Sequence, residues 1–217
     1  MNESASAAGE LEFLHVDSKL LVVNKPSGLL SVPGRGPDKQ DCLLRRVQAH
    51  YTDALTVHRL DMSTSGLMML ARGKAMERAL SILFQQRQVA KSYVAVVAGQ
   101  LRESVGEIVL PLLTDWPNRP RQKVDFLQGK PSQTRYRRLC SDPIQNTSRV
   151  ELEPLTGRSH QLRVHLQQIG HPILGDDLYA PPPVLAQSPR LLLHAQTLAF
   201  IHPHSGEALH FYCPAAF

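Results

Sequence analysis

Asp61 is the residue whose surroundings in the sequence best suit chemistry. It lies in residues 57–72, which read VHRLDMSTSGLMMLAR. Their order predicts a strand, a loop that carries Asp61 and a turn, and then a second, buried strand. Loops held by rigid elements commonly carry catalytic groups. Spacing alone, however, favours a structural role, in which the Asp61 carboxylate accepts an Asx-type hydrogen bond from the turn at residues 63–66.

The other groups that could carry chemistry lack the partners that their chemistry needs. The chain has ten histidines but no H-E-x-x-H motif, and His160 and His165 would diverge on a helix, so we predict no metal site. There is no G-x-S-x-G motif, which leaves a Ser-His-Asp hydrolase only as an alternative. Neither G-x-x-x-x-G-K-[ST] nor G-x-G-x-x-G occurs, so we predict no nucleotide cofactor.

What remains beside Asp61 is a set of arginines and a tyrosine in a strand pattern: Arg59, Arg158, Arg163 and Tyr93. A lone carboxylate can act as a nucleophile or a base if a positioned arginine keeps it ionised and oriented. Taken singly, Arg163 is better explained as a solvated helix arginine. Tyr93 is better explained as a core residue with its hydroxyl at the rim.

Short strands and a few helices are expected to position these groups. Apolar and β-branched runs predict strands at residues 20–23, 29–32, 67–71, 92–98, 134–139, 148–155, 191–194 and 197–202. Helical spacing predicts helices at residues 43–51, with Asp41 as cap, at 74–87, and from a Ser159 cap to Gly170. The basic segment 116–123 contains two prolines, which bar a regular helix, so a loop or ribbon should display its side chains.

Composition indicates an ordinary globular protein with a mild basic excess. The chain of 217 residues has 24 Lys and Arg against 19 Asp and Glu, a net charge of +5, which suits a polyanionic partner. Its three cysteines lack C-x-x-C spacing, so a reducing cytoplasm is the simplest compartment. We expect no signal peptide and no membrane-spanning segment. A flexible tail is expected at residues 1–12, and one domain of mixed α and β elements at 13–217.

Four ordered motifs resemble those of a known enzyme family. Residues 58–66, HRLDMSTSG, match every fixed position of the H-R-L-D-x-x-T-S-G signature of the RluA-type RNA pseudouridine synthases. The resemblance continues in VNKPSGL at residues 23–29, KSYVA at 91–95 and TGRSHQLRVH at 156–165. It covers the chain from about residue 20 to the C-terminus. DWPNRP at residues 115–120 resembles the short dual-specificity members, which act on tRNA and 23S rRNA.

The resemblance implies an α+β fold, the pseudouridine synthase fold, with a mixed, mostly antiparallel central β-sheet. Helices and loops would flank this sheet, and an RNA-binding cleft would cross its middle. The resemblance also implies a single catalytic domain at residues 13–217, without the S4-like RNA-binding domain of longer relatives.

The activity implied is isomerisation of uridine to pseudouridine in structured RNA, with no cofactor and no metal. The expected substrates are a tRNA anticodon stem-loop and a 23S rRNA stem-loop. We expect no obligate protein partner and a monomeric enzyme. A catalytically silent RNA-binding module that uses the same cleft is the alternative.

The resemblance also assigns roles to individual residues. Asp61 falls on the catalytic aspartate, which could add to C6 of the uracil, attack ribose C1′ or remove a ribose proton. Arg163 falls on the arginine that pairs with this carboxylate and holds it ionised. Tyr93 falls on the tyrosine that stacks on the base and provides a route for deprotonation at C5, and Leu162 would touch the uracil. Because the target base must flip out, Arg59 is expected to enter the vacated space.

Further residues of these motifs and of the basic loops are expected to contact the RNA. The candidates for phosphate contacts around a stem-loop are Lys25, Arg35, Arg119, Arg121 and Lys123. Arg158 and His160 are assigned to substrate binding. Trp116 is expected either to stack on a base or to belong to the core.

Overall fold

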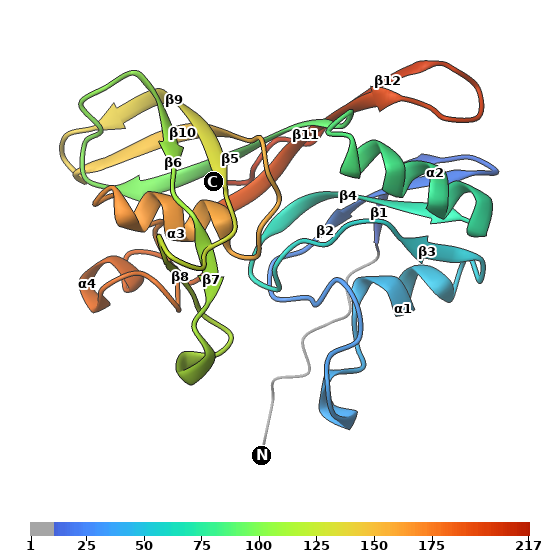
Figure 1. Cartoon of the computed structure of the whole chain (residues 1–217), viewed down its shortest axis with the longest axis horizontal. Helices are drawn as coiled ribbons and strands as arrows, with labels where there is room; N and C mark the ends of the chain where they lie inside the picture. The colour runs from blue at the N-terminus through green and yellow to red at the C-terminus, as the bar shows by residue number, and fades with distance from the viewer. Residues whose placement is uncertain (1–10) are drawn as a thin grey trace.

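A long mixed sheet forms the frame of the molecule (Figure 1). The computed structural model describes residues 11–217, and within them ten strands pair in the order β1-β2-β4-β11-β5-β10-β9-β6, with β3 beside β4 and β12 beside β11. The strands are β1 Glu12–Val16, β2 Leu20–Lys25, β3 Ala54–Thr56, β4 Ser65–Arg72, β5 Ala90–Ala98, β6 Val105–Val109, β9 Gln133–Asp142, β10 Thr147–Pro154, β11 Leu193–Ile201 and β12 Ala208–Tyr212. Among them only β4 and β11 pair in parallel, so the prediction of a mixed, mostly antiparallel sheet is confirmed.

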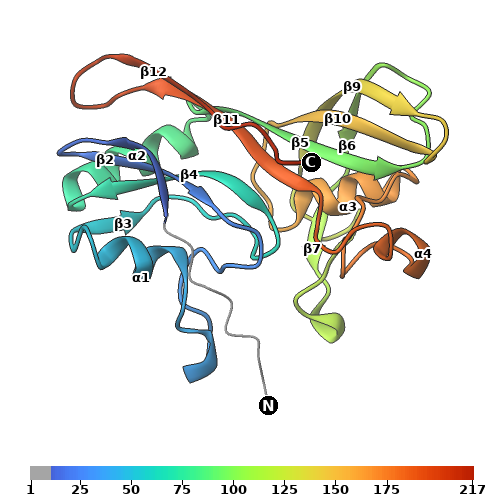
Figure 2. The ribbon, with the colours of Figure 1, turned by 180° about the vertical axis from the view of Figure 1, so that it is seen from behind.

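The helices of the described chain lie in two groups, one beside each half of the sheet (Figures 1 and 2). They are α1 Leu43–Gln48, α2 Lys74–Gln85, α3 Gln161–Gln168 and α4 Pro182–Leu185. The half formed by β1 to β4 carries α1 and α2, and the half that contains β5, β9 and β10 carries α3 and α4. None of these helices combines the length and the apolar content needed to span a bilayer.

Strand β4 is covered on both faces, which explains the unbroken apolar run of residues 67–71. On one face Met69 packs in a cluster with Leu80 of α2. On the other face Met68 packs in a cluster with Val47 of α1. A strand buried on both faces needs apolar residues at every position, because successive side chains alternate between the faces.

The start of β4 lies unusually close to β11, and Gly66 makes this approach possible. Gly66 has a φ of +112°, and a Cβ at this position would lie 2.3 Å from the Ala195 carbonyl oxygen. Only glycine fits such a conformation and such a gap. The glycine of the 58–66 motif therefore fastens the end of the Asp61 loop to the centre of the sheet.

The basic segment 116–123 belongs to a small ribbon outside the main sheet. Strands β7 Leu112–Thr114 and β8 Gln122–Val124 pair with each other, and a 3-10 turn at Trp116–Asn118 lies between them. The ribbon extends from the half of the molecule that carries α3 (Figure 1). The expectation that a loop or ribbon displays these side chains is confirmed.

Two expectations for the N-terminal half are wrong. Residues 29–32 form only an isolated bridge from Leu30 to Cys42 instead of a strand. Helix α1 is capped by Cys42, whose Sγ accepts from the Arg45 backbone N–H, while the Asp41 carboxylate pairs with Arg46. Of the predicted tail, residues 1–10 lie outside the described residues, and β1 begins at Glu12.

Two expectations for the C-terminal half also differ from the structure. Ser159 does not cap α3, because the cap residue is His160, which adopts the left-handed conformation with a φ of 53°. The strands expected at residues 191–194 and 197–202 are one strand, β11, with a register shift between Ala195 and Thr197. A bulge of this kind interrupts the alternation that a sequence pattern relies on.

Candidate active site

The loop that carries Asp61 joins β3 to β4, and its backbone is tied down on both sides of Asp61. Ser31 donates from Oγ to the Leu60 carbonyl at 2.6 Å and accepts from the Leu60 backbone N–H at 3.1 Å. On the other side, Lys25 Nζ donates to the Met62 carbonyl at 3.0 Å. The segment 25–31 therefore fixes both neighbours of Asp61.

Within residues 11–217, no group donates a hydrogen bond to the Asp61 carboxylate. The expected Asx-type hydrogen bond is not formed, because the turn is closed by the Thr64 backbone N–H donating to the Asp61 main-chain carbonyl at 3.1 Å. The Asp61 side chain is 28% exposed. His160 Nε2 lies 3.9 Å from one carboxylate oxygen and Arg163 Nη1 lies 4.0 Å from the other. A carboxylate held by its backbone but not bonded through its oxygens can react.

Arg163 reaches the site from α3, and its principal partner is Asp176 instead of Asp61. Its Nε and Nη2 donate to the two Asp176 carboxylate oxygens at 2.8 and 2.5 Å, and Nη2 also donates to Asp177 at 2.9 Å. The prediction of a solvated helix arginine is wrong, since Arg163 is 2% exposed. Burial lowers the pKa of Arg163, but the hydrogen bonds and charge of Asp176, together with Asp61 and Asp177, raise it overall. Arg163 therefore presents a permanent positive charge to Asp61.

Asp176 and Asp177 are site residues that the sequence reasoning missed. Asp176 is fully buried, and its Oδ1 also accepts from the backbone N–H groups of Leu178 and Tyr179 at 3.0 Å. A signal was present, because two adjacent acids follow Gly175 close to an arginine-containing motif. Nothing in that spacing identified the arginine that they bind.

His160 contacts the site through both ring nitrogens. Its Nδ1 lies 2.7 Å from the Tyr179 hydroxyl, and its Nε2 faces Asp61. Burial lowers the pKa of His160, although the nearby Asp61 charge opposes the shift. Burial raises the pKa of Tyr179 to about 12. His165 instead lies in the core with Ser132 and Thr134 as partners, so the predicted divergence of the two histidines is confirmed.

Tyr93 and Leu162 pack in the same apolar cluster. Tyr93 lies in β5 and packs against the buried cluster that includes Leu162, which is 7% exposed. Burial, assisted by the Asp61 charge, raises the pKa of Tyr93 and keeps its phenol protonated at neutral pH. The influence of the Asp61 charge on the Tyr93 phenol shows that Tyr93 lies near the Asp61 carboxylate.

The expectation that Lys25 contacts a phosphate is wrong. Lys25 is 0% exposed, and its Nζ donates to the carbonyls of Pro26, Leu29 and Met62 at 2.8–3.0 Å. Burial lowers the pKa of Lys25 to about 7, although the Asp61 charge opposes the shift. An ammonium that has no exposed surface cannot reach RNA, so Lys25 holds the Asp61 loop instead.

The remaining candidate residues lie at the surface. Arg35, Arg59, Arg119, Arg121, Lys123 and Arg158 are all exposed. Trp116 is 62% exposed, so the core alternative is wrong, and the Arg119 guanidinium lies 3.7 Å from its ring centroid. Arg121 bonds to the Leu178 carbonyl, and its guanidinium lies over the Tyr179 ring.

Comparison with known proteins decides the family. A family model described as RNA pseudouridylate synthase matches residues 19–168 of the chain. The chain belongs to this family of RNA-modifying enzymes. The matched residues contain Asp61, Tyr93 and Arg163, and the expectation drawn from the four motifs is confirmed.

Relatives within the family match nearly the whole chain. The dual-specificity RNA pseudouridine synthases RluA of Pasteurella multocida and of Escherichia coli K12 are 53% and 51% identical over 207 residues, covering 95% of this chain and 94% of each relative. Among solved structures, human RNA pseudouridylate synthase domain containing 1 has a TM-score of 0.81 at 30% identity and covers 96% of this chain and 84% of its own. The human domain containing 4 protein has a TM-score of 0.74 at 29% identity and covers 94% and 88%. The pseudouridine synthase fold and the isomerase class are therefore confirmed.

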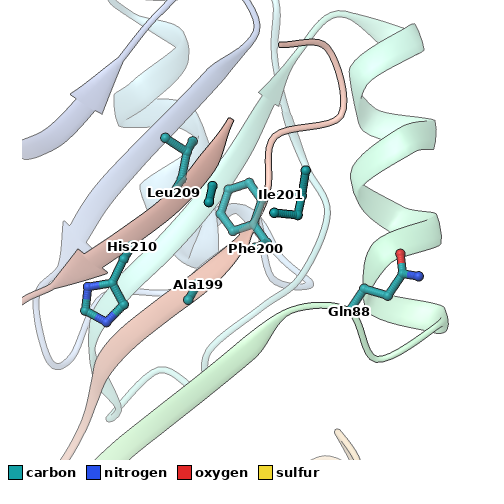
Figure 3. A pocket seen from close by; sticks show the side chains of 7 residues that line it. Gln88, Ala199, Phe200, Ile201, Leu209 and His210 are labelled. Carbon is teal, nitrogen blue, oxygen red and sulfur yellow. The ribbon is translucent and has the colours of Figure 1, made fainter. Parts of the chain in front are cut away.

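A surface hollow of about 310 Å³ lies elsewhere on the molecule (Figure 3). Gln88, which follows α2, lines it together with Phe200, Ile201 and Leu209 of the β11–β12 hairpin. None of the residues that meet at Asp61 contributes to it. Its lining is mostly apolar and carries no carboxylate.

Proposed function

We propose that this RNA pseudouridine synthase modifies a uridine in a tRNA anticodon stem-loop and a uridine in a 23S rRNA stem-loop, with Asp61 as the catalytic carboxylate. The relatives named dual-specificity match 94% or more of this chain, which supports two RNA substrates. One observation carries the role of Asp61. Hydrogen bonds hold the backbone on both sides of it, whereas its carboxylate accepts none from the described residues and faces Arg163 and His160.

The reaction breaks the bond from N1 of the uracil to ribose C1′ and joins C5 to the same carbon. Asp61 could add to C6, attack C1′ or remove a ribose proton, and each route requires an ionised carboxylate with an accessible oxygen. Arg163 places its guanidinium 4.0 Å from one carboxylate oxygen and leaves that oxygen without a hydrogen bond. A flipped base that displaces water would strengthen this attraction, because the site then has a lower effective dielectric constant.

Tyr93 and Leu162 would hold the uracil. The Tyr93 ring would stack on the base, and Leu162 would cover its apolar side. Because the phenol is protonated at neutral pH, its oxygen can take the C5 proton only if its own proton leaves at the same time. Arg59 is exposed in the Asp61 loop and would fill the space that the flipped base leaves.

The exposed cations around the site would bind the RNA backbone. Arg119, Arg121 and Lys123 of the ribbon and Arg158 before α3 are the candidates. We also propose that the enzyme acts as a monomer without an obligate protein partner, since one chain supplies Asp61, Tyr93 and Arg163. Free Cys42, Cys140 and Cys213 support a reducing compartment, the cytoplasm.

Two alternatives make different predictions for the same assay. A catalytically silent RNA-binding module would bind the stem-loops without modifying their uridines. It would have no need of a carboxylate that faces a polyanion. A Ser-His-Asp hydrolase would cleave small esters and ignore RNA. The free carboxylate of Asp61 favours the isomerase over both.

The deciding experiment is tritium release from C5-labelled uridine in tRNA and 23S rRNA transcripts. We expect release by the wild type, and none above background by Asp61→Ala or by the isosteric Asp61→Asn. Asp41→Asn is the matched control, because it removes a carboxylate that is 64% exposed and pairs with Arg46 instead of Arg163. Release by the Asp61 variants would refute the role of Asp61, and no release by the wild type from either RNA would refute the proposed substrates.

A further inference from the structure

A chain of polar groups leads from the ribbon to the Asp61 carboxylate. The backbone N–H of Gln122 in β8 donates to the Tyr179 hydroxyl at 2.8 Å. The same hydroxyl lies 2.7 Å from His160 Nδ1, and His160 Nε2 lies 3.9 Å from an Asp61 carboxylate oxygen. Three separate segments of the chain thus meet at one tyrosine hydroxyl.

The protons in this chain can be assigned from the groups that can only donate. A backbone N–H has no acceptor function, so the Tyr179 oxygen must accept from Gln122. The Tyr179 hydroxyl proton then needs an acceptor of its own, and among the residues that the structure describes His160 Nδ1 is the one in range. Burial lowers the pKa of His160, which favours the neutral ring, and a neutral ring that accepts at Nδ1 carries its proton on Nε2.

We propose that Tyr179 is a positioning residue that fixes His160 as the Nε2–H tautomer and directs this proton at Asp61. His160 then supplies a hydrogen bond to the carboxylate when the distance of 3.9 Å between Nε2 and the carboxylate oxygen shortens during the reaction. The catalytic benefit rests on the proposed function of Asp61. The tautomer of His160 does not depend on that function.

The backbone of His160 supports a functional role for this arrangement. Its φ of 53° lies in the left-handed region, which costs most residues free energy and is better tolerated by Asn, Asp and His. Strain of this kind persists where the surroundings hold a residue in place for its function. The Tyr179 ring packs edge-on against the imidazole, with 5.7 Å between ring centroids and an interplanar angle of 81°.

Two arginine guanidinium groups lie near the Tyr179 ring, one from the site and one from the ribbon. The Arg163 guanidinium lies 5.2 Å from the Tyr179 ring centroid, and that of Arg121 lies 5.6 Å from it. Arg163 belongs to the reaction centre, and Arg121 lies beside Gln122 in the ribbon. The hydroxyl is therefore oriented by the ribbon as well as by the site.

The first experiment observes the tautomer directly, and needs no activity. Imidazole ¹⁵N chemical shifts of the full-length protein distinguish a protonated from an unprotonated nitrogen, and His160→Asn identifies the signals of His160. We expect Nε2–H and unprotonated Nδ1 in the wild type, and a mixture of tautomers in Tyr179→Phe. A protonated Nδ1 in the wild type, or unchanged shifts in Tyr179→Phe, would overturn the proposal even if the enzyme proved to act on other RNAs.

The second experiment separates positioning from mere support of the fold. The terminal amide nitrogen of Gln can occupy the place of Nε2, whereas that of Asn reaches only the place of Nδ1. We expect Tyr179→Phe and His160→Asn each to lower kcat about ten-fold or more with little change in KM, and His160→Gln to retain more turnover than His160→Asn.

The double variant completes the test, because a glutamine has no tautomer to fix. In the His160→Gln background, Tyr179→Phe should change kcat by less than about two-fold. An equal loss in both backgrounds would mean that the hydroxyl only supports the structure. Thermal unfolding of each variant shows whether a lost kcat reflects an unfolded protein. If a variant is unfolded, the imidazole ¹⁵N shifts of the wild type decide.

Discussion

Arg163 and Asp176 form a buried two-point ion pair, and this pair leaves only one guanidinium nitrogen of Arg163 to face Asp61. Two guanidinium nitrogens are engaged by Asp176, and Nη1 faces Asp61 at 4.0 Å. The side chain of Asp176 is 1% exposed and that of Arg163 is 3% exposed. The orientation of the arginine is thus fixed by the fold before any RNA arrives, and Asp61 keeps its oxygens free.

Replacing Asp176 should damage both stability and turnover. Asp176→Asn keeps the shape but leaves the Arg163 charge buried beside a neutral group, and loss of one partner of a buried pair costs about 3–5 kcal/mol. Asp177→Asn removes a carboxylate that is 57% exposed, and should cost less than about 1 kcal/mol. Urea unfolding and single-turnover tritium release measure the two effects. Equal stability of the two variants would contradict the central place of Asp176.

Ribbon and site arginines should separate binding from catalysis. Arg121→Ala is expected to weaken RNA binding and to reduce the slope of log K against log salt by about 1. Lys123→Ala should weaken RNA binding and reduce this slope in the same way, and it leaves the contact of Arg121 with the Tyr179 ring in place. Arg163→Lys keeps the charge but loses the two-point contact, so it should lower turnover and leave binding nearly unchanged.

Filter binding at several salt concentrations measures these differences. Arg137→Ala is the control, because Arg137 is an exposed arginine of β9 that pairs with Glu151 and has no place in the proposed RNA surface. If Arg121→Ala and Arg163→Lys weakened binding equally, the division between ribbon and site would be wrong.

Lys25 should make stability depend on pH above neutrality. Its pKa is about 7 in the folded protein against an ordinary value of 10.5, so between these values the unfolded chain holds a proton that the folded protein has released. The free energy of unfolding should therefore rise with pH in this window, by at most about 1.4 kcal/mol per pH unit from this group. Lys25→Met removes this contribution, and guanidinium unfolding from pH 7 to pH 10 compares the slopes. Parallel curves for the two proteins would show that Lys25 keeps its ordinary pKa.

Gly66 should tolerate no side chain. Gly66→Ala places a Cβ 2.3 Å from the Ala195 carbonyl oxygen at a φ of +112°, and we expect a loss of more than about 3 kcal/mol of stability. Gly28→Ala is the matched control, since Gly28 has a φ of +83° and no atom within 4 Å of an added Cβ. Its cost should be the backbone strain, about 1–2 kcal/mol. Similar melting temperatures for the two variants would mean that β4 can move away from β11.

Local patterns in the sequence determined the elements around the site and the family. The apolar run at residues 67–71 is a strand, the spacing at 74–87 is a helix, and the prolines of 116–123 lie in a ribbon, because each pattern reflects the period or the backbone limits of its own segment. The placement of Asp61 in a loop between two strands follows from the same logic. The motifs around it were specific enough to identify the enzyme family.

Only the tertiary structure decided which side chains share a partner. Asp61 and Arg163 lie about a hundred residues apart, and no spacing shows that Asp176 binds the arginine first or that Tyr179 bonds to His160. Lys25 looked like a phosphate ligand because lysine is usually exposed, yet three carbonyls of neighbouring loops enclose it. Burial and hydrogen-bond partners depend on segments that meet only after folding, so charge and residue type could nominate these residues but could not assign their roles.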